Sequence, residues 1–143
     1  MKIYFACAIS GGRGNEHVYP PIVAHLRNHG EVLTEIFSDP NIFMLDGQVS
    51  DHEIFSRDLE WIKEADVIVA EVSTPSFGVG YEIALGELLG KRVLCLRKKQ
   101  ERKLSAMISG NPYKNLIIKE YSTIEEAILH IDGFFNRSSS SLH

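Results

Sequence analysis

Two carboxylates and a tyrosine are the side chains of this sequence best suited to chemistry. Glu82 lies where the glycine-rich stretch PSFGVGYE becomes an apolar run at helical spacing, Asp58 lies in FSRDLEWIKEAD, and Tyr4 lies in the first apolar run. Two carboxylates in different environments can divide the breaking of a glycosidic bond, because one attacks the sugar carbon while the other protonates the leaving group. A tyrosine hydroxyl within reach of Glu82 would orient it through a hydrogen bond.

The position of Glu82 predicts how it would act. We expect it in the first turn of a helix that begins near Gly80, where the helix dipole and nearby N–H groups would lower its pKa and keep it an ionised nucleophile. Each of the three side chains also has a structural explanation. Glu82 would complement the dipole, Asp58 would be a solvated acid beside Arg57, and Tyr4 would be a core residue.

The loop AISGGRG after the first apolar run is the candidate phosphate-binding segment. It matches neither G-x-G-x-x-G nor G-x-x-x-x-G-K-S/T, so we expect neither a dinucleotide cofactor nor a P-loop, and no cofactor at all. Free backbone N–H groups and hydroxyls can still bind the phosphate of a small molecule, with a plain tight turn as the alternative. The candidate donors are Ser10, Gly11, Gly12, Arg13 and Ser76.

Histidines and cysteines give no pattern typical of a metal site. The six histidines are scattered without ligand spacing, and neither cysteine has a CxxC partner, so we expect no metal. These residues are His17, His25, His29, His52, His130, His143, Cys7 and Cys95. Both cysteines lie in apolar segments, which favours buried thiols in a reducing compartment. A Ser-His-Asp triad is not expected either, since no G-x-S-x-G occurs.

Composition limits the class of protein. With 143 residues the chain has room for one domain, which we place at 1–136, with 137–143 as a disordered tail or a vector-derived remnant. A net charge of -4 with dispersed Lys and Arg argues against a nucleic-acid polymer as partner. No apolar run approaches a membrane span, and the N-terminus lacks signal-peptide features, so we expect a cytoplasmic protein with no membrane partner.

Apolar runs and helical stripes alternate along the chain. The predicted strands are 2–9, 31–37, 66–73, 92–97 and 115–121, and the predicted helices are 17–29 (beginning near Tyr19), 51–64, 80–89 and 123–135, with a short segment at 104–110. This order predicts an α/β fold: a single-domain, doubly wound, Rossmann-like or flavodoxin-like five-stranded parallel sheet with helices on both faces. Ligands bind such sheets at the carboxyl ends of strands, here after Ile9, Phe37 and Val72.

Three blocks of the sequence resemble a known family. They are IYFACAISGG, then DLEWIKEADVIVAEVSTPSFGVGYEIALGELLGKRVLCL, then LSAMISG, in the family's order over most of residues 2–110. The chain resembles the 2'-deoxynucleoside 5'-monophosphate N-glycosidases, relatives of the nucleoside 2-deoxyribosyltransferases. The resemblance implies an enzyme that hydrolyses the N-glycosidic bond of a deoxynucleoside monophosphate, releasing the base and 2-deoxyribose 5-phosphate.

The resemblance also implies roles for individual residues. Glu82 corresponds to the family's nucleophile, which forms a covalent deoxyribosyl intermediate, Asp58 to its acid/base carboxylate, and Tyr4 to the hydroxyl that positions the nucleophile. The implied enzyme is a homodimer in the cytoplasm and also in the nucleus, with Ser105 contributed to the partner's active site. The substrate contacts implied by position are Ile9, Ser10, Gly11, Gly12, Arg13, Ser76, Gly78, Ser105 and Met107.

The first loop departs from the family pattern. It reads Ala8-Ile9-Ser10-Gly11-Gly12 where the family usually has Ser-Ile-Arg-Gly-Gly, and the loss of a charge-assisted bond to phosphate costs on the order of 1.5–3 kcal/mol. Two other functions stay open at this point. One is transfer of the deoxyribosyl group between bases, and the other is nucleotide binding without turnover.

Overall fold

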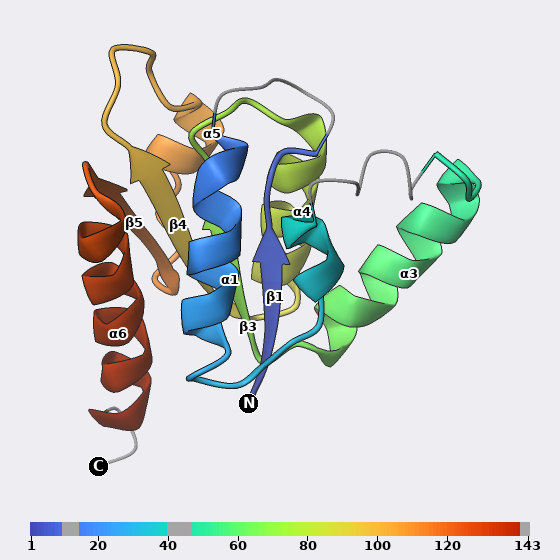
Figure 1. Cartoon of the computed structure of the whole chain (residues 1–143), viewed down its shortest axis with the longest axis horizontal. Coiled ribbons are helices and arrows are strands. Elements are labelled where there is room, and N and C mark those ends of the chain that lie inside the picture. The colour runs from blue at the N-terminus through green and yellow to red at the C-terminus, as the bar shows by residue number, and fades with distance from the viewer. Residues whose placement is uncertain (10–14, 40–46, 141–143) are drawn as a thin grey trace.

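The chain forms one five-stranded sheet in the order β2-β1-β3-β4-β5, and every neighbouring pair is parallel (Figure 1). The structure is a computed structural model that describes residues 1–9, 15–39 and 47–140. The strands are β1 (Lys2–Ala6), β2 (Glu31–Val32), β3 (Val67–Glu71), β4 (Arg92–Lys98) and β5 (Leu116–Tyr121). The helices are α1 (Tyr19–Leu26), α3 (Asp51–Glu64), α4 (Phe77–Leu88), α5 (Ala106–Ser109) and α6 (Ile124–Ser140), with 3₁₀ helices η1 (Glu16–Val18) and η2 (Glu35–Ser38). The predicted α/β fold is confirmed.

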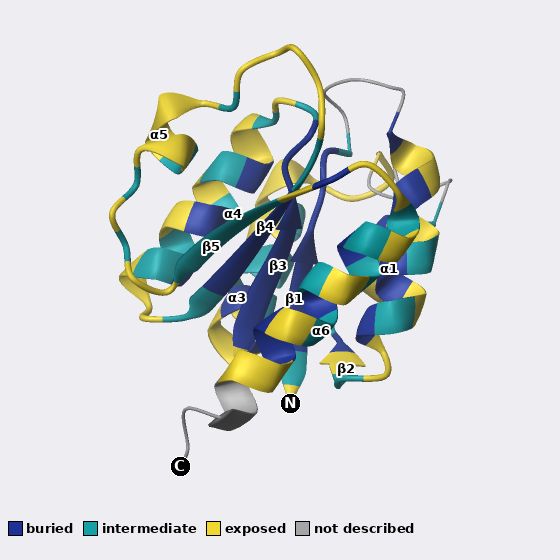
Figure 2. Ribbon diagram, turned by 90° about the vertical axis from the view of Figure 1, so that its left-hand side faces the viewer, coloured by how far each residue is buried: buried dark blue, intermediate teal, exposed yellow. Residues whose placement is uncertain are grey.

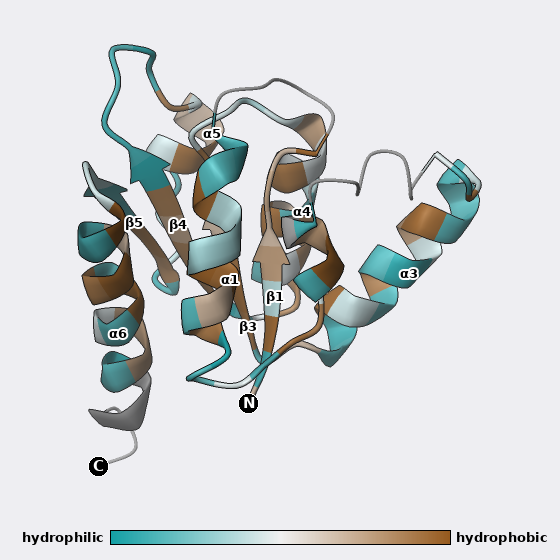
Figure 3. Cartoon of the chain, in the orientation of Figure 1, coloured by the Kyte–Doolittle hydropathy of each residue, from teal (hydrophilic) through white to brown (hydrophobic). Residues whose placement is uncertain are grey.

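Helices cover both faces of the sheet, as Figure 2 shows. Helices α1 and α6 pack together on one face, and α3 and α4 pack together on the other. The central strands β1 and β3 are therefore buried on both sides, which explains why their sequences are apolar runs. In Figure 3 the hydrophobic residues follow these strands, whereas the helices carry both kinds of residue.

The strand register decides which side chains face which helices. Tyr4 pairs with Ile68, and Ile68 pairs with Val93, so these three point to the same face of the sheet. That face is covered by α4, because a Cβ placed on Gly86 of this helix would lie 2.2 Å from Ile68 Cδ1 and 3.7 Å from Val93 Cγ2. Tyr4 therefore points from the sheet toward the helix that carries Glu82.

The predicted second strand is wrong beyond its first two residues. β2 ends at Val32, and the chain then turns into η2 instead of continuing to residue 37. The buried hydroxyl of Thr34 donates to the carbonyl of Phe5 and accepts from its N–H, both at 2.8 Å. This side chain satisfies the β1 backbone groups that a longer β2 would have paired, so the alternating pattern does not need to continue as a strand.

Helix α4 begins three residues earlier than predicted. Ser76 is its N-cap, and the Ser76 Oγ accepts a hydrogen bond from the Val79 N–H at 3.2 Å. Glu82 therefore lies in the second turn and not in the first, which corrects its predicted position. Both glycines of the stretch, Gly78 and Gly80, are inside the helix.

The other helix boundaries follow their caps. The Ser50 Oγ accepts from the Glu53 N–H at 3.1 Å, and the Thr123 Oγ1 accepts from the Glu126 N–H at 3.2 Å, so these two hydroxyls cap the first turns of α3 and α6. α6 continues to Ser140, so the predicted tail is helical over residues 137–140, and 141–143 lie outside the described residues. Within the described ranges, no helix combines the length and the apolar character that crossing a bilayer requires.

Candidate active site

Tyr4 and Glu82 meet at the sheet face that α4 covers. The Tyr4 hydroxyl donates a hydrogen bond to Glu82 Oε2, although the two residues are 78 positions apart. Tyr4 is fully buried, and its burial, followed by the negative charge of Glu82, raises the pKa of its phenol. The hydroxyl therefore stays protonated and acts as a fixed donor. The predicted pairing of these two side chains is confirmed.

The ionisation of Glu82 differs from the prediction. Burial raises the pKa of its carboxyl to about 7. The hydrogen bond from Tyr4 lowers this pKa, the charge of Asp58 raises it further, and the charge of Arg57 lowers it. The expectation of a lowered pKa is thus wrong. The second turn of α4 lacks the free N–H groups that would have stabilised the charge, and desolvation of the carboxylate outweighs its hydrogen bond. Near neutral pH both protonation states of Glu82 are populated.

Asp58 is the second carboxylate of the same cluster. It lies on α3, and Arg57 Nε donates to its Oδ1 at 2.9 Å, with one fifth of the Asp58 side chain exposed. Its charge raises the pKa of both Tyr4 and Glu82, so it lies within electrostatic range of the pair. The structure therefore brings the three predicted catalytic residues together from β1, α3 and α4.

An aromatic row beneath these residues was not predicted from the sequence. The Tyr4 ring contacts Phe37 edge to face at 6.1 Å, and Phe37 contacts Trp61 in the same way at 6.2 Å. The Arg57 guanidinium lies over Trp61 at 5.0 Å and over Phe37 at 5.6 Å. These contacts hold Arg57 beside the two carboxylates, because a guanidinium is attracted to aromatic faces. In the sequence, the one indication of this aromatic row was Phe37 at the end of the predicted second strand.

A large cavity lies next to this cluster. Its volume is about 1350 Å³, and its lining includes four of the predicted substrate contacts: Ser76, Gly78, Ser105 and Met107. Segments from the start of α4 and from around α5 form it, so the positive end of the α4 dipole faces the space. In the part of the chain that the structure describes, the lining does not include Tyr4, Asp58 or Glu82.

Gly78 connects the cavity to Glu82. A Cβ placed on this lining residue would lie 3.7 Å from Glu82 Oε1 and 3.8 Å from Ser76 Oγ. The absence of a side chain at Gly78 therefore leaves the carboxylate close to the cavity wall. Of the other predicted contacts, Ile9 is partly buried at the end of the first segment, and Ser10, Gly11, Gly12 and Arg13 lie outside the described residues.

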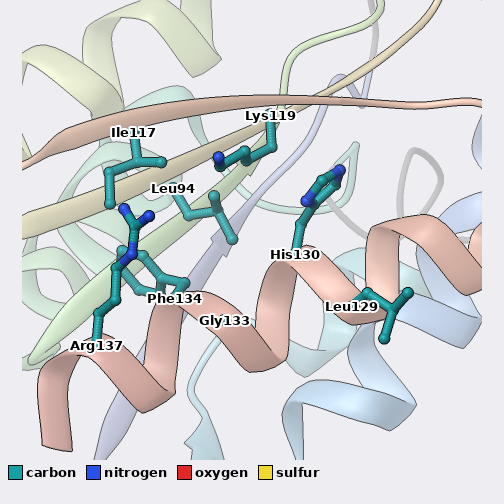
Figure 4. A pocket seen from close by; sticks show the side chains of 8 residues that line it. All are labelled: Leu94, Ile117, Lys119, Leu129, His130, Gly133, Phe134 and Arg137. Atoms are coloured by element: carbon teal, nitrogen blue, oxygen red, sulfur yellow. The ribbon is translucent and has the colours of Figure 1, made fainter. Parts of the chain in front are cut away.

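A second cavity is too small for a typical small-molecule site. It holds about 140 Å³ between β4, β5 and α6, where Lys119, His130 and Arg137 surround Leu94 and Phe134 (Figure 4). Pockets for small molecules usually have about 300–1,000 Å³. This cavity is smaller, and it lies on the α6 face of the sheet, away from Glu82.

Glu71 is a buried acid that the sequence interpretation treated as part of an apolar strand. Its carboxylate accepts from the N–H and the hydroxyl of Ser73 at 2.7 and 2.9 Å, and from the Tyr121 hydroxyl. Burial raises its pKa above the usual value. Asn15 donates to the same Tyr121 hydroxyl at 3.4 Å, so this network ties the ends of β3 and β5 to the start of η1. In the sequence, the acid in the otherwise apolar run VIVAE was the indication of this network.

The histidine interpretation also needs a correction. His25 and His29 are four residues apart, which is a spacing that places two side chains on one side of a helical segment. The structure brings both next to Asp132 of α6, with ligand atoms within 4.8 Å of one another. His25 and His29 therefore do have ligand spacing, and the prediction of scattered histidines is wrong for this pair.

Two carboxylates close to a large cavity, on helices that cover one face of a parallel α/β sheet, can together break a bond at a sugar carbon. Residues 3–124 match the model of the nucleoside 2-deoxyribosyltransferase family, and the chain belongs to this family.

Three relatives that are similar to this chain over most of its length are named as N-hydrolases. A rat protein named 5-hydroxymethyl-dUMP N-hydrolase is 46% identical over 112 residues, which are 76% of this chain and 69% of the rat protein. A Tetraodon nigroviridis protein of the same name is 38% identical over 141 residues, covering 96% and 99% of the two chains. A Syntrophotalea carbinolica protein, named as a putative 2'-deoxynucleoside 5'-phosphate N-hydrolase, is 44% identical over 113 residues, covering 78% and 80%.

Solved structures share the fold. A CMP N-glycosidase from Clostridium botulinum superposes with a TM-score of 0.67 at 18% identity and covers 92% of this chain and 99% of its own. A 2-deoxyribosyltransferase from Bacillus psychrosaccharolyticus superposes with a TM-score of 0.59 at 19% identity, covering 90% of each chain. The predicted family and fold are both confirmed.

Proposed function

We propose that the chain hydrolyses the N-glycosidic bond of 2'-deoxynucleoside 5'-monophosphates, giving the free base and 2-deoxyribose 5-phosphate. The contact between Tyr4 and Glu82, with Asp58 nearby, carries this proposal. The names of relatives that are 38–46% identical support it.

In the first step, an ionised Glu82 oxygen bonds to C1' of the sugar while the bond between C1' and the base nitrogen breaks. The base leaves with the electron pair and takes a proton from Asp58, in the state in which the two carboxyl groups share a single proton and Asp58 holds it. In the second step, water attacks C1', gives a proton back to Asp58 and releases Glu82. Positive charge develops on the sugar ring in both steps, and the Glu82 carboxylate stabilises it. The Tyr4 hydroxyl holds one carboxylate oxygen and leaves the other free to react.

The phosphate would lie at the start of α4. The helix dipole and the Ser76 hydroxyl provide a polar, partly positive wall of the large cavity. Met107 and Gly78 line the same space, and the Gly78 backbone approaches a ligand without steric hindrance. A substrate that carries a phosphate uses these groups, whereas a free nucleoside does not.

The proposal is tested by incubating the protein with each deoxynucleoside monophosphate and with each unphosphorylated nucleoside. Each reaction is run with and without a second free base, and base release and base exchange are followed by chromatography. Release from monophosphates alone supports the hydrolase. Exchange of bases would show a transferase, and silence with every substrate would show a binding protein without turnover.

Removal of the Tyr4 hydroxyl should shift the pH profile of this reaction. The hydrogen bond from Tyr4 lowers the pKa of Glu82, so Tyr4→Phe raises that pKa and moves the acidic limb of kcat/KM to higher pH. A hydrogen bond to a charged group contributes roughly 1.5–3 kcal/mol, which corresponds to a shift of about 1–2 pH units. Tyr19→Phe is the matched control, because it removes a buried hydroxyl that is bonded to Ala8 at 3.4 Å. An acidic limb that stays unchanged in Tyr4→Phe would contradict the assignment.

We further propose a homodimer in which Ser105 reaches the partner's site. An apolar stripe on α4 supports it: Phe77, Tyr81 and Leu88 are 101%, 56% and 83% exposed, and they lie along one side of the helix. Met107, which lines the same cavity as Phe77 and Tyr81, is 83% exposed. Large contiguous apolar patches on a protein surface mark interaction sites, and most homo-oligomers are two-fold dimers.

Leu88→Glu should dissociate this dimer. Burial of one leucine contributes about 1.5–3 kcal/mol, and the symmetry of a dimer doubles it, so the dissociation constant should rise roughly 10²–10⁴-fold. Sedimentation velocity across a dilution series measures this. Leu129→Glu is the control, because Leu129 is 69% exposed on α6. A wild-type chain that sediments as a monomer at high micromolar concentration would refute the proposal.

Two buried thiols support the proposed location of the protein in the cell. Cys7 and Cys95 are both free and buried, and burial raises the pKa of Cys95 to about 12. The predicted buried thiols are confirmed, and they support a reducing compartment such as the cytoplasm, with the nucleus as a second location.

A further inference from the structure

A group of side chains on the α1/α6 face, far from Glu82, converges on one carboxylate oxygen. His25 Nε2 lies 2.6 Å and His29 Nε2 lies 2.8 Å from Asp132 Oδ1. His25 belongs to α1, His29 follows the end of that helix, and Asp132 belongs to α6, which packs against α1 (Figures 1 and 2). The potential ligand atoms all lie within 4.8 Å of one another.

The two imidazole rings are held in place by their surroundings. The His29 ring stacks on Phe135 with 4.4 Å between centroids and 7° between planes. The His25 and His29 rings meet edge to face at 5.6 Å. Their Nε2 atoms point at the same oxygen, so little side-chain entropy would be lost if an ion were bound there.

The cluster is open to solvent. The side chains of His25 and His29 are 20% and 21% exposed, and that of Asp132 is 38% exposed, so an ion and a water molecule can reach it. Two neutral imidazoles and one carboxylate form a donor set typical of Zn²⁺ and unlike that of Mg²⁺ or Ca²⁺, which prefer oxygen ligands.

We propose that His25, His29 and Asp132 form a binding site for Zn²⁺ or a similar divalent transition metal, with water in the fourth position. Metal–ligand distances of about 2.0–2.2 Å require the two nitrogens to move slightly apart from the carboxylate oxygen, which small rotations of three partly exposed side chains allow. The bound ion would fasten α1 to α6. It would act on stability and not on the chemistry of Glu82, which lies on the other face of the sheet.

The test uses the full chain, without an affinity tag, after treatment with EDTA. Zn²⁺ is titrated by calorimetry, and Co²⁺ is titrated by visible absorption, which reports its coordination geometry. We expect one high-affinity ion per chain, the absorption bands of four-coordinate Co²⁺, and a rise of several degrees in Tm at saturating Zn²⁺. Absence of binding at millimolar Zn²⁺ would overturn the proposal.

Variants assign the ligands. Zn²⁺ binding should be weakened by each of three variants: His25→Gln, His29→Gln and Asp132→Asn. Each loss should exceed the roughly 10–100-fold that removal of a hydrogen-bond partner of a metal ligand costs. His17→Gln, an exposed histidine before α1, should bind Zn²⁺ as the wild type does. Circular dichroism checks that each variant is folded. If the three variants bind as tightly as the wild type, the ion is bound elsewhere and the site is a hydrogen-bonded cluster only.

Discussion

Glu82→Gln should abolish base release while leaving the protein folded. The amide keeps the size of the carboxylate and can still accept a hydrogen bond from Tyr4, but it cannot bond to C1' as an anion or balance the charge of the sugar ring. By analogy with the removal of other enzyme nucleophiles, we expect kcat to fall on the order of 10⁴-fold or more. Single-turnover assays with a deoxynucleoside monophosphate measure this loss.

The experiment includes a matched control variant and the detection of the covalent intermediate. Glu60→Gln changes an exposed glutamate on α3 that pairs with Lys63 at 3.3 Å, and it should leave kcat unchanged. Mass spectrometry of the wild type quenched during turnover should show one added deoxyribose phosphate, which Glu82→Gln should lack. Full activity of Glu82→Gln would remove the proposed mechanism.

The same variant should be more stable than the wild type at high pH. The pKa of Glu82 in the folded chain is about 7 against an ordinary value of 4.5, so folding disfavours the ionised form. Wild-type stability is therefore lost as pH rises from about 4.5 to 7, by up to about 3 kcal/mol. Glu82→Gln avoids this loss, so its Tm should exceed that of the wild type at pH 8 and match it near pH 4. A Tm gap independent of pH would contradict the raised pKa.

Asp58→Asn should have the second largest effect on activity. An amide cannot protonate the departing base, and loss of a general acid costs about 10²–10⁴-fold in rate. The loss should shrink with a leaving group that departs without a proton, such as a nitrophenolate on the same sugar phosphate. Comparison of kcat/KM for the two substrates therefore separates loss of the acid from misfolding.

The pH profile of Asp58→Asn gives a second signature. The charge of Asp58 raises the pKa of Glu82, so its removal should move the acidic limb to lower pH, opposite to the shift of Tyr4→Phe. Asp51→Asn changes an exposed acid at the start of α3 and serves as the control. It should change neither the rate nor the acidic limb of the pH profile. Equal losses with both leaving groups would rule out Asp58 as the general acid.

Local features of the chain were predictable because short-range physics decides them. The short, continuous apolar runs of β1 and β3 are typical of strands buried on both faces, and the hydroxyls of Ser50 and Thr123 cap the first turns of the helices that follow them. The alternation of these elements determined the parallel sheet. Helices α3 and α4, which carry Asp58 and Glu82, pack together on one face of that sheet.

Contacts between distant residues decided the rest. Thr34 ended β2 by bonding to Phe5, and burial in the folded chain, not position in a helix, determined the pKa of Glu82. His25 meets Asp132 across 107 positions of sequence. Desolvation and side-chain pairing depend on which surfaces pack together, so no local pattern contains them, and only the tertiary structure shows them.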